Sequence, residues 1–159
     1  MSANVILSGL DEAELTALAQ RLAPAMRDGA SIHLSGELGA GKTTFARALL
    51  KAVGVGERVK SPTYSLVESY RVGELDVHHL DLYRIADPGE LEWLGLSDLA
   101  TPSALLLVEW PERGGDALSA PDLHVFLRHA GGTRDLDIRA GARGAQLLDM
   151  AGVRAAPDS

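Results

Sequence analysis

The chain has 159 residues, of which 46% are apolar and 23% are charged, which suits one globular domain. Its 15 basic and 22 acidic residues leave a net charge of −7, which argues against a broad electrostatic grip on nucleic acid, and we expect no binding to DNA. Without cysteine there is no disulfide framework and no thiolate metal site, as in proteins of a reducing cytosol. We see no signal peptide and no apolar run of membrane-spanning length, so we expect a cytoplasmic protein that does not bind membranes.

A single domain is expected over residues 1–154, with a frayed tail over 155–159. Its first part reads as a short strand near residues 5–7, followed by a helix. Asp11 is predicted to cap this helix, with Glu14 completing a capping box. Apolar residues recur at helical spacing, and Pro24 is expected to kink or end the helix. We expect this helix to cover a sheet.

A phosphate-binding loop is the most specific feature of the sequence. Gly36, Gly41, Lys42 and Thr43 fit the pattern G-x-x-x-x-G-K-[ST] without a mismatch. Glycine allows the backbone angles and close approaches of such a loop, whose N–H groups can then point at phosphate oxygens. Lys42 would reach the β- and γ-phosphates, and the Thr43 hydroxyl would ligate Mg²⁺. A short strand before the loop and a helical pattern after it, which Gly54 can end, give the expected context.

We therefore predict a nucleotide site and prefer it to a glycine-rich turn that binds nothing. The loop residues predicted to contact the nucleotide are Gly36, Glu37, Leu38, Gly39, Ala40, Gly41, Lys42, Thr43 and Thr44. The helix that starts near Lys42 would add the positive end of its dipole.

A loop and a hairpin are predicted next. Pro62 bars a helix, and Thr63 is a candidate sensor of the γ-phosphate and its Mg²⁺, although an ordinary turn explains the pattern equally well. Residues 66–72 and 75–80 read as two strands joined by a two-residue turn at 73–74. Parallel strands cannot be joined by so short a turn, so the sheet must be mixed.

Two acidic residues are placed at predicted strand ends. Asp81 would share a strand face with His79 and could hold water or the Mg²⁺ shell, the alternative being a solvated strand end. The apolar run 104–108 predicts a strand buried on both faces, which ends in Glu109. An acid at this place in P-loop proteins holds the water shell of Mg²⁺, and the alternative is a charge where a strand meets water. Trp110 could offer a ring to a base or pack in the core.

Between these acids lies another predicted helix. Asp87 would be its N-cap, Pro88 its first residue and Glu90 the end of a capping box, and Gly95 would end it. We assign Trp93 to packing.

The last part of the chain reads as a second hairpin and a helix. Residues 123–128 and 136–140 alternate between apolar and polar, with a turn at 131–132, and residues 142–151 can form a short helix. The five histidines lack metal-binding helical spacing, so no zinc site is proposed.

Two classes of P-loop protein can be weighed from sequence. A GTPase should carry N/T-K-x-D, but the one asparagine is Asn4 and no lysine is followed two residues later by aspartate. A small-molecule kinase needs a lid and an acceptor pocket, for which the chain has limited room. Arg113 could serve a lid, so a kinase stays open.

The sequence resembles the TsaE family, the bacterial ATPases of tRNA threonylcarbamoyladenosine biosynthesis. The matching blocks occur in family order over most of residues 35–114, and one mild departure is Tyr64, where phenylalanine is common. The blocks are 36–45, 61–64, 79–84, 92–95 and 108–113.

The resemblance implies an ATPase of low activity that uses ATP and Mg²⁺ and works with the TsaB–TsaD heterodimer. That pair would form N6-threonylcarbamoyladenosine at position 37 of tRNA. The present chain would contact tRNA only indirectly, through the complex with the pair. By resemblance, Thr43 and Glu109 serve Mg²⁺, Asp81 acts in hydrolysis, Thr63 is a switch residue, and Trp110 lies near the nucleotide. The expected fold is a three-layer α/β P-loop NTPase with a mixed sheet.

The mechanistic hypothesis assigns catalytic roles to three residues. Lys42 would stabilise charge on the phosphates, while either Asp81 or Glu109 would orient the attacking water. Two alternatives stay open: a small-molecule P-loop kinase, and a nucleotide-gated binding module whose hydrolysis is incidental.

Overall fold

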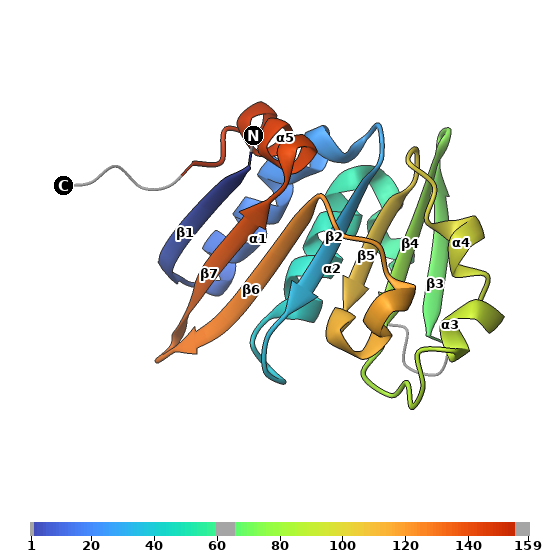
Figure 1. Ribbon diagram of the computed structural model, residues 1–159. Helices are drawn as coiled ribbons and strands as arrows, with labels where there is room; N and C mark the ends of the chain where they lie inside the picture. Colours follow the sequence, from blue (N-terminus) through green and yellow to red (C-terminus); the bar gives the residue numbers. More distant parts are fainter. Residues whose placement is uncertain (1, 60–65, 155–159) are drawn as a thin grey trace.

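A computed structural model describes residues 2–59 and 66–154 of the chain (Figure 1). Within these residues, seven strands form one mixed sheet in the order β1-β7-β6-β2-β5-β4-β3. The strands are β1 (Ala3–Leu10), β2 (Ala30–Ser35), β3 (Val67–Val72), β4 (Leu75–Asp81), β5 (Leu105–Glu109), β6 (Leu123–Ala130) and β7 (Thr133–Ala140). Thr63 and the predicted tail at 155–159 lie outside the described residues.

The centre of the sheet is parallel and its margins are antiparallel. β4, β5, β2 and β6 run in the same direction. β3 pairs antiparallel with β4, β7 with β6, and β1 with β7, so the two predicted hairpins and the mixed sheet are confirmed. Leu34 on β2 and Asp81 on β4 both pair with Glu109 on β5. The ends of these three parallel strands therefore meet at one edge of the sheet.

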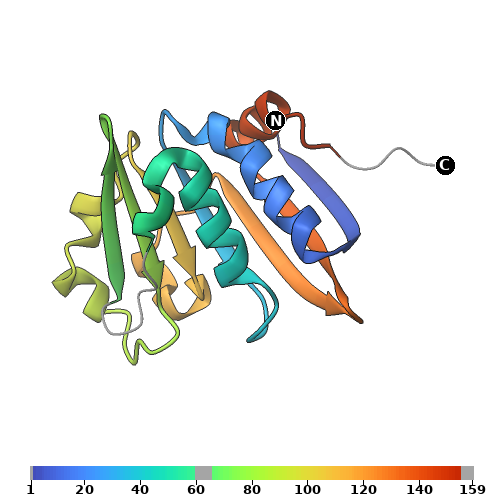
Figure 2. The same ribbon diagram turned by 180° about the vertical axis from the view of Figure 1, so that it is seen from behind.

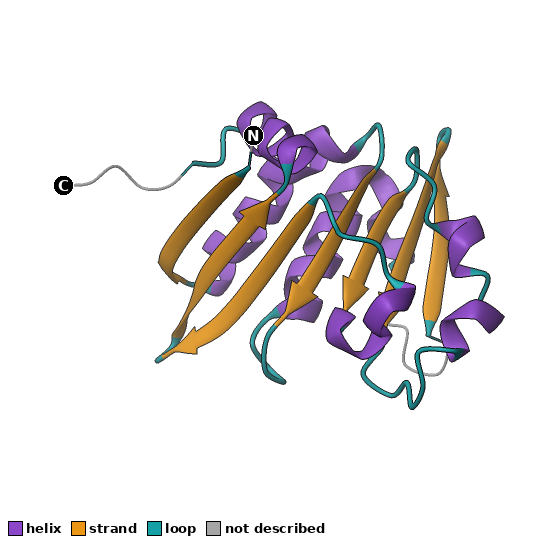
Figure 3. Ribbon diagram, viewed as in Figure 1, coloured by secondary structure: helices purple, strands orange, loops and turns teal. Residues whose placement is uncertain are grey.

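Helices cover the two faces unequally (Figures 1 and 2). α1 (Glu12–Leu22) and α2 (Lys42–Leu50) pack on one face over the main apolar core. On the other face, α3 (Glu90–Trp93), α4 (Leu96–Leu99) and the helical segment Pro111–Ala117 cover a smaller core that includes Leu80, Leu106 and Val108. α5 (Ala142–Ala151) follows the last strand (Figure 3). None of the helices described is long and apolar enough to cross a membrane.

The N-terminal helix forms as predicted. The Asp11 side chain accepts a hydrogen bond from the Glu14 N–H at 2.7 Å, and the Glu14 carboxylate accepts one from the Asp11 N–H at 3.3 Å, which completes the capping box. The α-helix ends at Leu22, and Pro24 lies in the 3-10 turn Ala23–Met26, as expected of a residue without an N–H. β1 is longer than the strand predicted near residues 5–7, because β7 supplies backbone hydrogen-bond partners along it. The local sequence gives no sign of this pairing.

Two expectations for the α3 region are wrong. Asp87 is not the N-cap: its carboxylate accepts a hydrogen bond from the Gly89 N–H at 2.9 Å, and α3 begins only at Glu90, with Gly89 as its cap. Pro88 is therefore not the first helical residue, and Glu90 closes no capping box. Trp93 does not pack, because its side chain is 92% exposed. In this single turn Leu91 takes the buried position, and a residue two places later lies on roughly the opposite side of a helix.

Candidate functional site

The phosphate-binding loop joins the end of β2 to the start of α2, as its motif predicts. Gly36, Gly39 and Gly41 have φ angles of 152°, 78° and 105°, where a side chain is strained. A Cβ on Gly36 would lie 2.4 Å from the Leu127 carbonyl oxygen of β6, closer than two such atoms can approach. The loop therefore depends on glycine both for its backbone angles and for its contact with the sheet.

Lys42 lies in the middle of this loop, with 4% of its surface exposed. Its ammonium group donates to the carbonyl oxygens of Gly36 at 2.5 Å and Glu37 at 2.7 Å. It also lies 4.3 Å from the ring centroid of Trp110, in cation–π geometry. Burial lowers the pKa of Lys42, while the negative charge of Glu109 and other nearby carboxylates opposes that shift. The site thus holds one positive charge among carbonyl oxygens, carboxylates and an aromatic ring.

Glu109 is held on both sides. Its Oε1 accepts a hydrogen bond from the Thr43 hydroxyl at 3.0 Å, and its Oε2 lies 2.6 Å from Nε2 of His79. The side chains of His79 and Glu109 are 0% and 3% exposed. A buried carboxylate needs such partners, because each unpaired polar atom costs about 1–3 kcal/mol. Two residues, Thr43 of α2 and His79 of β4, thereby fix the carboxylate of Glu109 on β5 beside the loop.

Asp81 occupies the end of the neighbouring strand, in register with Glu109. One of its oxygens, Oδ1, accepts a hydrogen bond from the Tyr83 N–H at 3.1 Å. Burial raises the pKa of Asp81, and the charge of Glu109 adds to the effect. No other hydrogen bond of its side chain is found within the described ranges. Asp81 can therefore accept further hydrogen bonds, whereas both oxygens of Glu109 already have partners.

A cavity of about 230 Å³ brings these groups together. Its lining joins the loop, the ends of β4 and β5, and the start of β7: Leu38, Gly39, Gly41, Lys42, Thr43, Thr44, Asp81, Tyr83, Glu109, Trp110 and Arg134. The structure thus assembles the predicted residues at the carboxyl edge of the parallel strands. Trp110 is half-buried in a left-handed conformation, with φ 58°, and packs 5.0 Å from Tyr83.

The sequence matches one family of known proteins. The family model described as threonylcarbamoyl adenosine biosynthesis protein TsaE matches residues 10–136 of the chain. The chain belongs to the TsaE family. The tRNA threonylcarbamoyladenosine biosynthesis protein TsaE of Haemophilus influenzae is 41% identical over 109 residues, which are 69% of each chain. That of Bacillus subtilis is 35% identical over 118 residues, 74% of this chain and 73% of the relative.

A solved structure extends the likeness to the fold. The crystal structure of Bacillus subtilis YdiB superposes with a TM-score of 0.78 at 26% identity, and the match covers 96% of both chains. This TsaE family member therefore has the predicted α/β P-loop NTPase fold with a mixed sheet.

Three residues of the site were not assigned a role from sequence: His79, Tyr83 and Arg134. His79 could have been found, because it shares a strand face with Asp81 and is followed two residues later by that acid. Arg134 could not, because it lies on β7, far along the chain from the loop. Its guanidinium donates to the carbonyl oxygens of Ala40 at 3.0 Å and Gly39 at 3.3 Å, so it braces the loop from the hairpin side.

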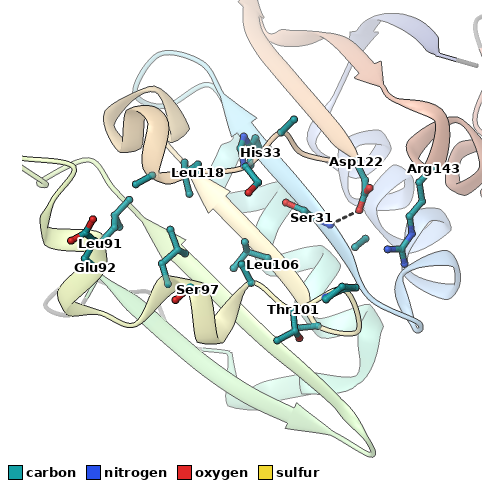
Figure 4. Close-up of a pocket in the computed structure, with 18 residues that line it drawn as sticks. Ser31, His33, Leu91, Glu92, Ser97, Thr101, Leu106, Leu118, Asp122 and Arg143 are labelled. Atoms are coloured by element: carbon teal, nitrogen blue, oxygen red, sulfur yellow. Dashed lines mark hydrogen bonds between the residues drawn. The ribbon is translucent and has the colours of Figure 1, made fainter.

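A larger hollow of this TsaE family member lies elsewhere. A pocket of about 730 Å³ lies on the face of the sheet that α3 and α4 cover (Figure 4). It contains none of the residues predicted from the P-loop motif. The smaller cavity is the better candidate for a nucleotide site, because it gathers a lysine, a hydroxyl and carboxylates, the groups that suit phosphate and Mg²⁺.

Proposed function

We propose that this TsaE family member binds ATP with Mg²⁺ and hydrolyses it in support of the TsaB–TsaD heterodimer. In this proposal the heterodimer forms N6-threonylcarbamoyladenosine at position 37 of tRNA, and the chain meets tRNA only through it. The observation that carries the ATPase half is the Thr43–Glu109 contact at 3.0 Å, directly beside Lys42 and the loop. We propose a cytoplasmic location for this activity, because the proposed role is in tRNA modification.

The donor set suits Mg²⁺. A hydroxyl and a carboxylate oxygen are hard ligands, and magnesium usually takes one or two protein oxygens together with phosphate and water. Among the described residues no group of three His, Asp or Glu side chains could hold a metal alone, so Thr43 and Glu109 would share the ion with the nucleotide. When bound, Mg²⁺ would neutralise charge on the β- and γ-phosphates. His79 keeps Glu109 turned toward Thr43.

The two carboxylates take different roles in this proposal. Glu109 contacts Thr43, the other proposed ligand, and His79 fixes its orientation, so Glu109 serves the metal. Asp81 has spare acceptor capacity and a raised pKa, which suits a general base, so Asp81 orients the attacking water. Lys42 contributes positive charge at the phosphates. Thr63, which lies outside the described residues, remains our candidate for the nucleotide-sensing switch.

Magnesium titration separates these roles. We expect ATP turnover to require Mg²⁺ and to be abolished by EDTA. Thr43→Val should raise the half-saturating Mg²⁺ concentration by about tenfold or more, because it removes an oxygen donor. Asp81→Asn should instead lower kcat by about 100-fold at saturating Mg²⁺, because it removes the base.

The titration also has outcomes that contradict the proposal. Turnover that persists in EDTA would exclude a Mg²⁺-dependent ATPase. An unchanged Mg²⁺ requirement in Thr43→Val would remove Thr43 from the metal site. Transfer of phosphate to a metabolite without release of inorganic phosphate would favour the small-molecule kinase.

A further inference from the structure

The most exposed large apolar side chain in the described part of the chain is Trp93, at 92%. Tryptophan has a large apolar surface, and it is among the residues that contribute most to protein–protein binding. Other apolar side chains on the surface are less exposed, including Met150 at 69% and Leu38 at 63%. Trp93 projects from a single-turn helix whose buried contact is made by Leu91. Its position therefore needs an explanation beyond the fold of this chain.

The helix that carries Trp93 forms one wall of the 730 Å³ hollow. Leu91 and Glu92 line it, together with Leu106 of β5 and Leu118, and Figure 4 shows these four side chains around the same space. The leucines give this end of the hollow an apolar lining. An apolar side chain of another molecule could be buried here, while Trp93, which does not line the hollow, lies on the outer side of the same turn.

His33 provides an unused polar group in this hollow. It lies on β2, lines the hollow, and is 5% exposed, and no hydrogen bond of its ring is found among the described residues. Burial lowers its pKa to about 4, so the ring is neutral at pH 7. A neutral imidazole can donate one hydrogen bond and accept another. His33 can therefore offer a hydrogen bond to a polar group that enters the hollow.

The charge along the segment that contains α3 and α4 is one-sided. Residues 86–99 contain four acidic residues and no basic residue, and all four are exposed: Asp87, Glu90, Glu92 and Asp98. At the other end of the hollow, Arg143 donates to the Gly29 carbonyl oxygen at 2.6 Å, and Asp122 accepts from the Ser31 N–H at 2.9 Å. The α3–α4 side thus presents a negative surface with one aromatic ring.

We propose that Trp93 and the adjoining hollow form the docking surface for a partner protein that presents lysine or arginine side chains around an apolar residue. The apolar residue enters the leucine-lined end, and the basic residues face the carboxylates of α3 and α4. Charge complementarity favours this occupant over a second copy of the chain, whose own α3–α4 surface is acidic. The inference rests on the proposed function, because it takes the TsaB–TsaD pair as that partner.

The test measures the affinity of the TsaB–TsaD pair for the wild-type chain and for Trp93→Ala, by calorimetry with ATP and Mg²⁺. We expect Trp93→Ala to weaken binding by about tenfold or more, as for an interface hot spot. Met150→Ala, which removes an exposed apolar side chain on α5, should change the affinity less than about twofold. Glu90→Lys should weaken binding most at low salt, where charge attraction is least screened.

The outcomes distinguish the two proposals. ATP turnover without partners should be the same in Trp93→Ala and wild type, since Trp93 does not line the nucleotide cavity. Equal affinity of the two chains for the pair would overturn the docking surface while leaving the ATPase intact. Absence of binding by the wild type would overturn both the partnership and this inference. A homodimer lost in Trp93→Ala, with unchanged affinity for the pair, would identify a second copy as the occupant.

Discussion

Replacing Lys42 with alanine is expected to weaken ATP binding by about 10- to 100-fold. The lysine is the cation at the centre of the loop, where its ammonium group is within hydrogen-bond distance of two loop carbonyl oxygens. Charge-assisted hydrogen bonds contribute about 1.5–3 kcal/mol each, and every 1.4 kcal/mol is a factor of ten in affinity. Turnover should fall at least as far, because charge on the phosphates increases in the transition state. Calorimetry with ATP and a phosphate-release assay measure the two effects.

Lys51→Ala is the matched control. Lys51 follows the last residue of the same helix and is exposed, so its removal should leave both the affinity and the rate within about twofold of wild type. Far-UV circular dichroism checks that both variants keep their helices. Unchanged ATP affinity and turnover in Lys42→Ala would show that the loop does not hold the phosphates.

Replacing His79 with leucine is expected to raise the Mg²⁺ requirement of ATP binding by about 10- to 100-fold, as for other partners of metal ligands. The His79 ring is fully buried and lies 2.6 Å from Oε2 of Glu109. Without it, that buried oxygen has no partner and Glu109 is free to turn away from Thr43. The free energy of unfolding should fall by about 1–3 kcal/mol, the usual cost of one unsatisfied buried polar group. Titration of Mg²⁺ against nucleotide binding and urea denaturation measure the two effects.

Two further variants separate positioning from simple packing. His79→Gln keeps an N–H donor on a side chain of similar reach and should recover part of the Mg²⁺ affinity. His78→Leu changes the neighbouring histidine, which points to the opposite face of β4 and bonds the Ser69 hydroxyl at 2.8 Å, so the Mg²⁺ requirement should not change. If His79→Leu lowered stability but left the Mg²⁺ requirement unchanged, His79 would support the fold and not the metal site.

Local patterns were sufficient to predict much of the fold. The capping box at Asp11, the loop between β2 and α2, and the two hairpins all depend on residues close together in sequence. The tight turn between β3 and β4 also predicted the mixed sheet, because its length excludes a parallel pair. The order of the strands was not predicted, since it depends on contacts between segments far apart in the chain.

The acidic residues and the loop of the site were predicted from the sequence. The side chains that position them, His79 and Arg134, were not. Glu109 follows an apolar run, which marks the end of a buried strand. Its contact with His79 joins β4 to β5 across 30 residues, and Arg134 reaches the loop across more than 90. Neither distance leaves a local pattern. Trp93 misled the prediction because a tryptophan is usually packed, and no residue pattern marks one that is left exposed by a single-turn helix.

The central claim is tested most directly by the ATP turnover rate of the purified chain, alone and with the TsaB–TsaD pair from the same source. We expect slow turnover by the chain alone and clear stimulation by the pair, with turnover by Lys42→Ala at least about tenfold lower in both conditions. A partner that completes or moves the site would raise kcat in this way. No stimulation, together with no complex in the presence of ATP and Mg²⁺, would contradict a partner-dependent ATPase and leave only a P-loop nucleotide binder.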